Sequence, residues 1–513
     1  LPPKGDVSDW LDTGGDKAKL LEIVNATKPL TAEDIAQMRP RPIQATQEEA
    51  TRSPLEAAKA GSPVMCTDLG NAKRFAFNHG ERVRHCQRLN AWFVWSGTHW
   101  QRDETGMVHR LAFKTVEKIW DECRVCGDTD RQRELSKHAV DSQSRGKIEA
   151  MLALATKMPG IAVSPDAWDR DPMVLNCLNG TLDLRTGKLR PHDAADMLTK
   201  ICPVEYDPDA RLDVWDRFLD MATEGNTELS TFLQRATGYS ITGLTSEERL
   251  FFVHGGTATG KSTFLQAILA ALGSYAMTSN FDTFLAKHHG DSVPVDLANM
   301  AGARIVVASE TNKGRALDEG RIKSLTGGEA IRARKLYCDE FEYKPQFALW
   351  LAANDAPHMS DADAALWRRI VRVPFENTIP ESERDPNVKR TLSDPDQAGP
   401  AILAWAVQGC LAWQREGLQV PAIVTAATQE LRTEMDPLQE FLDDRCVFIA
   451  EASTPVSALR AEYDQWARES GLKWLLSPKD FNRRIAEKGC LRKTTWWNGK
   501  DCKCWHGIGL QSA

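Results

Sequence analysis

A glycine-rich loop with a lysine and two hydroxyl side chains is the part of this sequence best suited to chemistry. Residues 255–263 read GGTATGKST and meet the pattern G-x-x-x-x-G-K-[ST] through Gly255, Gly260, Lys261 and Ser262. Glycine lets the backbone curl its N–H groups around phosphate oxygens. Lys261 is then placed to reach the terminal phosphates, and the Ser262 hydroxyl is placed to hold Mg²⁺. The pattern predicts a P-loop that binds a nucleoside triphosphate, here expected to be ATP with Mg²⁺.

The elements around this loop are those that must position it. The apolar run Leu250–Val253 predicts a strand before the loop, and Phe264–Leu272 predicts a helix after it, whose positive N-terminal end faces the same anion. The residues expected to contact the nucleotide are Gly255, Gly256, Thr257, Ala258, Thr259, Gly260, Lys261, Ser262 and Thr263. A P-loop by itself indicates only nucleotide binding, so the function must be argued from the rest of the chain.

Composition indicates an ordinary globular chain of several domains. The 513 residues have 42% apolar content, which is enough for ordinary cores. No apolar run approaches the roughly 20 residues that cross a bilayer, which excludes a membrane-spanning helix. No export signal is visible, so we expect a cytoplasmic protein, in the host cell if phage-encoded. The first residue is Leu1, and we expect a fragment or a processed product.

Cysteine spacing and charge bear on possible ligands. The 12 cysteines lack a disulfide-framework spacing and are expected to be reduced. Cys123 and Cys126 have metal-ligand spacing without a second pair nearby, which leaves a zinc site open. The net charge is −7, yet residues 455–513 hold 11 Lys and Arg against 6 Asp and Glu. The basic end is a candidate for phosphate contact.

The region before the P-loop predicts strands followed by helices. NGTLDLRTGKL predicts a hairpin that turns at Gly187. Residues 213–237 carry large apolar side chains at helical spacing, which predicts helices packed ahead of the P-loop strand. Four tryptophans lie beside predicted strands and helices and are expected to pack in cores, although base stacking is the alternative: Trp92, Trp95, Trp100 and Trp120.

Four stretches of sequence carry a family resemblance. DPMVLNCLNGTLDL, ICPVEYDP and LQRATGYSITG resemble the helical domain that precedes the ATPase in phage and plasmid primase-helicases, which belong to the superfamily 3 helicases. GDVSDWLDTGG, near the start, resembles the end of a toprim-type primase domain. The resemblance implies a primase domain upstream in the native chain.

The resemblance continues after the P-loop. ARIVVASE places Glu310 at the end of a buried strand, which matches the family's Walker B position. The match implies that Glu310 polarises the attacking water and, with Ser262, holds Mg²⁺. The family often has two acids there, whereas the first position here is Ser309. Whether a group other than Ser262 and Glu310 helps to hold Mg²⁺ therefore stays open.

Two further motifs complete the match. Asn354, which closes FALWLAAN, matches the sensor asparagine that contacts the γ-phosphate or the attacking water. Arg368 and Arg369 match the arginine pair, one of which is expected to act as a finger on a neighbouring subunit's ATP. A finger in trans implies a ring, expected to be a homo-hexamer. An ion pair within one subunit is the alternative.

Two basic regions are expected to contact DNA. The sequence around KSLTGGEAIRARKLY matches the family's B′ region, whose hairpin carries cations that grip a single strand. Residues 455–513 predict two helices and a β-wing, and they resemble a winged-helix domain that binds duplex DNA. The expected DNA contacts are Lys323, Arg332, Arg334, Lys335, Arg483, Arg484 and Lys488. A solvated charged hairpin and a winged helix for protein contact stay open as alternatives.

Together these features predict an α/β fold, with a P-loop ATPase core of the AAA+ type, a mainly helical α+β N-terminal domain and a C-terminal winged helix. The predicted parts are a primase-like remnant with a linker (1–63), an N-terminal helicase-associated domain (64–248), the ATPase core (249–400), a helical connection (401–454) and the winged helix (455–513). The expected function is an ATP-dependent DNA helicase of phage or plasmid replication, which unwinds duplex DNA by ring translocation on a single strand.

Two other functions stay open. An ATPase switch that loads or remodels replication proteins without unwinding would use the same nucleotide site. A small-molecule kinase would leave the basic hairpin, the sensor and the arginine pair unexplained.

Overall fold

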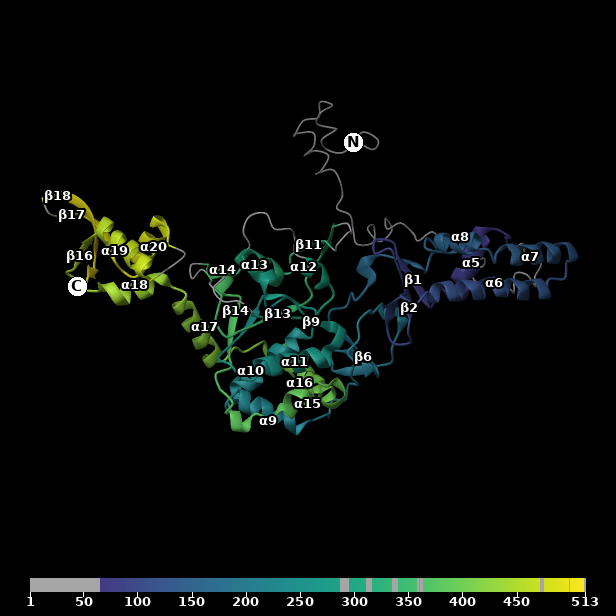
Figure 1. Cartoon of the computed structure of the whole chain (residues 1–513), viewed down its shortest axis with the longest axis horizontal. Coiled ribbons are helices and arrows are strands. Elements are labelled where there is room, and N and C mark those ends of the chain that lie inside the picture. The colour runs from purple at the N-terminus through teal and green to yellow at the C-terminus, as the bar shows by residue number, and fades with distance from the viewer. Residues whose placement is uncertain are drawn as a thin grey trace, which may run out of the picture. The chain divides into compact units, whose positions relative to one another are not determined.

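The computed structural model describes residues 65–286, 295–310, 316–334, 340–357, 359, 363–470, 475–497 and 499–511 (Figure 1). These residues form two compact units. The helical unit holds residues 65–80 and 106–161, and the main unit holds residues 81–105 and 162–511. The primase-like remnant and linker predicted for residues 1–63 lie outside the described residues.

The helical unit contains four helices: α5 (Asp68–His79), α6 (Met107–Val125), α7 (Thr129–Asp141) and α8 (Arg145–Ala155). A buried ion pair joins two of them, because Arg74 of α5 lies 2.7 Å from the carboxylate of Glu122 on α6. Ile119 and Leu135 are also buried and join α6 to α7. This unit is therefore held by one buried charge pair inside an apolar helix interface.

The main unit begins with two small sheets. The first has the order β3-β2-β1-β4 and comprises β1 (Val83–Cys86), β2 (Ala91–Trp95), β3 (Trp100–Arg102) and β4 (Ala162–Val163). The second comprises β5 (Val174–Cys177), β6 (Gly180–Asp183) and β7 (Lys188–Arg190). The β6–β7 hairpin turns at Gly187, whose φ is 69°, so the predicted hairpin is confirmed. Trp100 is 1% exposed, which confirms packing for that tryptophan.

Along the chain, two helices follow these sheets and precede the nucleotide loop, as the apolar spacing predicts. They are α9 (Asp213–Ala222) and α10 (Thr227–Ser240), and their apolar side chains at that spacing are buried. Gly238 of α10 lies so close to the long helix α16 (Pro395–Glu416) that a Cβ there would come within 2.0 Å of the Cys410 nitrogen. The close packing of α10 on α16 therefore requires glycine at this position.

A five-stranded parallel sheet forms the centre of the main unit. Its order is β14-β8-β13-β10-β9, with the bounds β8 (Leu250–His254), β9 (Ala276–Thr278), β10 (Ile305–Ser309), β13 (Ala348–Ala353) and β14 (Ile370–Pro374). All six residues of β13 are buried, as expected for a parallel strand that is covered on both faces. Parallel strands end at one edge, so the residues that follow β8, β10 and β13 meet there.

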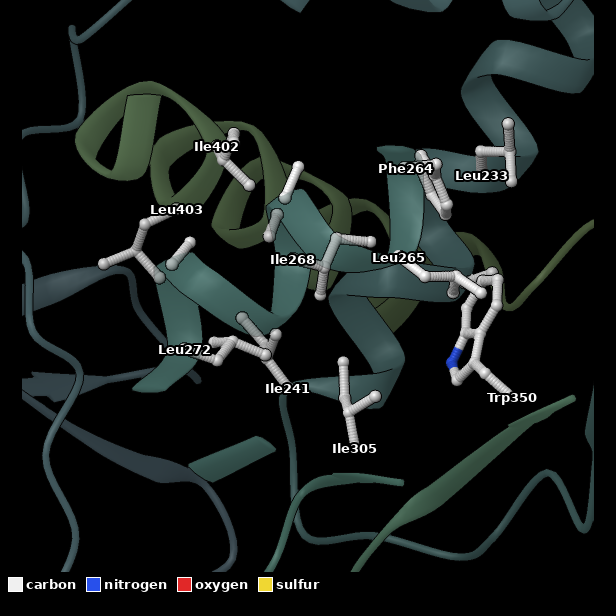
Figure 2. Packing of buried hydrophobic residues seen from close by; sticks show 14 of the residues in the cluster. Leu233, Ile241, Phe264, Leu265, Ile268, Leu272, Ile305, Trp350, Ile402 and Leu403 are labelled. Atoms are coloured by element: carbon white, nitrogen blue, oxygen red, sulfur yellow. The ribbon is translucent and has the colours of Figure 1, made fainter. Parts of the chain in front are cut away.

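Helix α11 (Lys261–Leu272) packs on one face of this sheet. Figure 2 shows Phe264 and Ile268 of α11 in one apolar cluster with Ile402 of α16 and Trp350 of β13. The ring of Phe264 lies 6.0 Å from that of Trp350. This packing of α16 on α11 fixes the direction in which α11 leaves the loop.

The remaining elements lie around this core and C-terminal to it. Short helices and a hairpin follow the sheet strands: α12 (Val295–Asn299), α13 (Glu319–Thr326), β11 (Ile331–Arg334), β12 (Glu340–Tyr343), α14 (Ala364–Trp367) and α15 (Pro386–Leu392). The C-terminal part comprises α17 (Ala422–Glu434), α18 (Pro437–Arg445), β15 (Cys446–Val447), β16 (Ser453–Pro455), α19 (Val456–Glu469), α20 (Pro478–Glu487), β17 (Leu491–Trp497), β18 (Lys500–His506) and β19 (Gly509–Leu510). The predicted α/β class is confirmed. Within the described residues, no helix is both long and apolar enough to cross a membrane.

Candidate functional site

The loop between β8 and α11 is shaped by close contacts that only glycine permits. Gly255 has φ 153°, and a Cβ there would lie 1.8 Å from the carbonyl oxygen of Phe375. Gly260 has φ 91°, in the left-handed region, and faces the ring of Phe218 from α9. The segment after β14 also holds the loop, because the Ile379 N–H donates to the Ala258 carbonyl at 3.0 Å. The loop is therefore fixed from two sides.

Lys261 lies inside this loop. Its Nζ donates to the carbonyls of Gly255 and Gly256 at 2.7 and 2.5 Å, and it lies 3.3 Å from the Thr259 hydroxyl. The residue is 8% exposed, and burial lowers the pKa of its ammonium. The loop thus holds a cation against its own carbonyl groups. Phosphate oxygens placed at the loop would offer that cation stronger acceptors.

The strand register brings the predicted catalytic residues to the same edge. Ala353 of β13 pairs with His254 of β8, so Asn354 follows directly beside the start of the loop. The Glu310 N–H donates to the Ala352 carbonyl at 2.8 Å, which sets Glu310 beside the end of β13. The structure therefore brings Glu310 and Asn354 together next to the predicted P-loop.

His254 is a residue of this edge that the sequence did not single out. Burial, reinforced by the nearby charges of Arg372 and Lys261, lowers the pKa of His254 to about 4. The imidazole is therefore neutral at pH 7. Its position immediately before Gly255 is the only sequence signal that could have marked it.

The arginine pair is bound to a carboxylate of the same subunit. Glu248, two residues before β8, places one oxygen 3.2 Å from Arg368 Nη2 and 2.8 Å from Arg369 Nη2. Arg369 also donates to the Ala365 carbonyl at 2.8 Å. The two side chains differ in exposure, which is 65% for Arg368 and 9% for Arg369. Only Arg368 presents its guanidinium to solvent.

Glu248 itself was missed by reasoning from sequence. It adopts φ 50°, which is uncommon for a residue other than glycine, and it lies about 120 positions from the arginines that it contacts. No local pattern connects residues so far apart. Only the pairing of β8 with β14 brings them together.

The predicted B′ hairpin corresponds to β11–β12. In the described part of this hairpin, the arginines of one strand are matched by an equal number of glutamates on the other. Arg332 Nε lies 2.7 Å from the carboxylate of Glu342, and Arg334 stands opposite Glu340. The ion pair raises the pKa of Arg332. Cross-strand pairs of this kind follow from the alternation in IRAR and EFEY, a signal that the sequence carries. Lys335 lies outside the described residues.

Lys323 is also engaged within the chain. Its Nζ lies 2.5 Å from Asp363, and this residue in turn caps α14 by accepting the Leu366 N–H at 2.9 Å. The ion pair lowers the pKa of Asp363, in opposition to the effect of its partial burial. In this structure Lys323 therefore positions α14, the helix that leads to the arginine pair.

The basic residues predicted on the second C-terminal helix have different roles. Arg484 of α20 is 5% exposed and lies 3.0 Å from Asp436, and this ion pair holds α20 to the start of α18. Arg483 pairs with Glu487 at 2.7 Å and remains at the surface. Lys488 donates to the side chain of Gln439 on α18. These side chains line a cavity of about 520 Å³ that also contains acidic groups.

The cysteine pair in the helical unit has partners other than a metal. Cys123 Sγ donates to the Gln132 carbonyl at 3.4 Å, and Cys126 Sγ donates to the Asp128 carbonyl at 3.6 Å. Across the residues for which positions are given, no three His, Cys, Asp or Glu side chains gather as metal ligands.

Comparisons of the sequence with known proteins give two family models and several viral relatives. The family model described as "D5 N terminal like" matches residues 72–224, and the model of a family of unknown function (DUF5906) matches residues 253–369. Together these ranges cover more than half of the chain, and the second contains the loop, Glu310, Asn354 and the arginine pair. The protein named "Putative helicase 022R" of frog virus 3 is 30% identical over 230 residues. These matches support a phage or viral primase-helicase family for the chain.

Other relatives match over longer stretches. "Putative helicase L207/L206" of Acanthamoeba polyphaga mimivirus is 24% identical over 310 residues, or 57% of this chain. "Putative primase C962R" of African swine fever virus is 24% identical over 327 residues, or 58% of this chain, and the frog virus match covers 42% of it. The chain spans only 32%, 33% and 23% of the length of these three relatives, respectively.

A solved structure also resembles this chain. The apo structure of the NrS-1 C-terminal region matches with a TM-score of 0.45 and 11% sequence identity, and the match covers 83% of this chain and 96% of that one.

Proposed function

We propose that this chain is an ATP-dependent DNA helicase of phage, plasmid or viral replication, which unwinds duplex DNA by translocating as a ring along a single strand. Its relatives in large DNA viruses carry the names of helicases and primases, which supports an enzyme that acts on DNA. The single observation that carries the proposal is the convergence of Lys261, Glu310 and Asn354 at one edge of the parallel sheet. Ligands of open α/β sheets bind at this edge.

The loop from Gly255 to Ser262 has the features that a triphosphate requires, and we propose it as a P-loop in an AAA+ type core. Helix α11 begins at Lys261, and the preceding residue Gly260 offers no side-chain cap to its first turn. The first N–H groups of that helix can therefore donate to phosphate oxygens, as its dipole also favours. Lys261 Nζ would exchange the loop carbonyls for the terminal phosphates.

The residues around the loop also fit a magnesium ion. Ser262 is exposed in the first turn of α11. Glu310 directly follows β10, which is separated from β8 in the sheet by β13. A hydroxyl and a carboxylate are therefore available as oxygen ligands. When bound, Mg²⁺ would neutralise charge that develops on the phosphates. Glu310 would accept the proton of the attacking water, and Asn354 would orient that water. Arg368, which is exposed, would reach the nucleotide of a neighbouring subunit.

The rest of the proposal concerns DNA and assembly. We propose that α19, α20 and the β17–β18 hairpin form a winged helix that binds DNA, that the ring is a homo-hexamer, and that a primase domain precedes this region in the native cytoplasmic protein. An arginine that acts on a neighbour's site requires head-to-tail contacts, and such contacts close into a ring when the rotation permits.

The test is ATP hydrolysis with and without single-stranded DNA, together with unwinding of a tailed duplex. We expect hydrolysis that DNA stimulates and unwinding that requires ATP. Lys261→Ala serves as the matched control, because contaminating nucleases or ATPases would survive that substitution. Hydrolysis without DNA stimulation or unwinding would reject the helicase and retain the nucleotide site.

An ATPase switch that loads or remodels replication proteins is the second candidate. It is favoured by the described part of the B′ hairpin, where Arg332 and Arg334 stand opposite Glu342 and Glu340. A hairpin with balanced charge attracts a phosphate backbone less than one with cations alone. Replacing Glu340 and Glu342 by Gln separates the two functions, because a hairpin that grips DNA should then show stronger DNA stimulation of hydrolysis. An unchanged response would favour the switch.

A further inference from the structure

The hairpin formed by β17 and β18, residues 491–506 and here called the C-terminal hairpin, carries a tryptophan that the fold does not use. Trp496 is 69% exposed, whereas Trp466 and Trp505 of the same C-terminal part are each 2% exposed and lie in its apolar core. A large aromatic ring in water forgoes the free energy that burial would supply. Its exposure therefore needs a reason outside the packing of this chain.

The strand register places Trp496 at the far end of one face of this hairpin. The directly opposed pairs Arg492–Trp505, Thr494–Lys503 and Trp496–Asp501 alternate along the two strands, so their side chains share that face. Trp505 anchors one end of the face in the core. The other end, which carries Trp496, extends away from that anchor and is exposed.

Two cations of the hairpin, Arg492 and Lys503, share the face of this ring, and Lys493 and Lys500 lie on the opposite face. The hairpin contains four Lys and Arg residues against one acid, Asp501, and all four are exposed: Arg492, Lys493, Lys500 and Lys503. Lys503 is the diagonal cross-strand neighbour of Trp496. Among the residues with described positions, none of the four has a carboxylate within ion-pair distance, in contrast to Arg483 and Arg484 of α20. The cations of the hairpin are therefore not neutralised by ion pairs within the described residues.

We propose that the C-terminal hairpin binds single-stranded DNA, with Trp496 stacked on an unpaired base and Lys503 on a flanking phosphate. An exposed aromatic ring among cations is the combination that holds a single strand, because every base has a π-face and every linkage a negative charge. Bases inside a duplex have no free face, so duplex DNA would meet only the cations. The inference rests on the proposed function and names the partner of this surface.

The experiment measures binding of the full chain to a fluorescein-labelled dT20 by anisotropy, because the 16 tryptophans of the chain obscure the signal of one. Trp496→Ala should weaken dT20 binding by about 5- to 150-fold, the range of one lost base–aromatic stack. Trp496→Phe should recover most of that affinity. Binding to a blunt duplex should change by less than about 2-fold, because no base is free to stack.

Two controls separate stacking from other effects. Leu491→Ala removes another exposed apolar side chain of the same strand, on the opposite face, and should leave dT20 affinity unchanged. An abasic 20-mer should bind the wild type and Trp496→Ala equally. Lys503→Ala should reduce the slope of log affinity against log salt by about 0.7 for a single strand.

Three results would overturn the inference. Equal dT20 affinity of Trp496→Ala and the wild type would assign the ring to a protein partner. If Trp496→Ala lost the same affinity for duplex DNA as for dT20, the tryptophan would contact the DNA backbone and would not stack on a base. Absence of dT20 binding in the wild type would reject the surface altogether. DNA-stimulated ATP hydrolysis of the wild type, measured in parallel, shows whether the proposed function stands when the inference fails.

Discussion

Arg368 and Arg369 should have separable roles, one in turnover and one in stability. Both contact the same oxygen of Glu248, but Arg369 is 9% exposed and Arg368 is 65% exposed. A finger that reaches a neighbouring subunit must be accessible. We therefore expect Arg368→Ala to abolish hydrolysis with little effect on folding, and Arg369→Ala to destabilise the protein.

The magnitudes follow from these contacts. Loss of an exposed ion pair costs about 0–1 kcal/mol, so Arg368→Ala should lower the melting temperature by at most about 2 °C. Removal of one partner of a buried pair costs about 3–5 kcal/mol, and the 40% exposure of Glu248 reduces that to roughly 2 kcal/mol. Arg369→Ala should then lower the melting temperature by roughly 2–4 °C. Turnover should fall by about 10³–10⁵ in Arg368→Ala.

The assay for action in trans mixes two inactive proteins. Arg368→Ala retains an intact loop, and Lys261→Ala retains an intact arginine. Random mixing in a ring would join a working loop to a working arginine at about a quarter of the interfaces and should restore hydrolysis in that proportion. Glu248→Gln is the matched control, because it weakens the intrasubunit pairs and leaves both arginines in place. It should keep hydrolysis and lose stability.

Several outcomes would refute this reasoning. Wild-type turnover by Arg368→Ala would exclude it as the finger. Equal melting temperatures for the two arginine variants would contradict the division of roles. Co-assembled mixtures that stay inactive would leave Arg368 as an ion-pair residue of its own subunit.

The remaining predictions concern the nucleotide edge. Lys261→Ala should lower turnover more than about 100-fold, because an ammonium no longer meets the phosphates, while circular dichroism stays unchanged; near-normal turnover would move the site elsewhere. Glu310→Gln should bind ATP, measured by calorimetry, and lose about 10²–10⁴ in turnover, and full activity would place the base on another residue. Because the pKa of His254 is lowered to about 4 in the folded state and is about 6.5 when unfolded, the unfolded chain binds this proton first. Acidification from pH 6.5 towards 4 should therefore lower the free energy of unfolding of the wild type more than that of His254→Gln. The same pH dependence of the free energy of unfolding in both proteins would contradict this prediction.

Much of the nucleotide edge was predictable because its signals are local. The loop at 255–263 depends on glycines and a lysine at fixed spacing, and Glu310 and Asn354 each end a short apolar run. Buried parallel strands read as continuous apolar segments, and their carboxyl ends share one edge. Order along the chain was therefore sufficient to place these residues near one another. The helices at 213–237 followed from apolar spacing in the same way.

What the basic residues contact was decided by the tertiary structure. The sequence marks Arg484 and Arg332 as cations at suitable places, but it does not state that one is buried against Asp436 and the other paired with Glu342. Glu248 meets the arginine pair only because β8 and β14 are neighbours in the sheet. A charge has no periodic signature, and its partner can lie 120 residues away. Long-range packing, which buries some cations and leaves Trp496 with others at the surface, determines which of them remain available to a ligand.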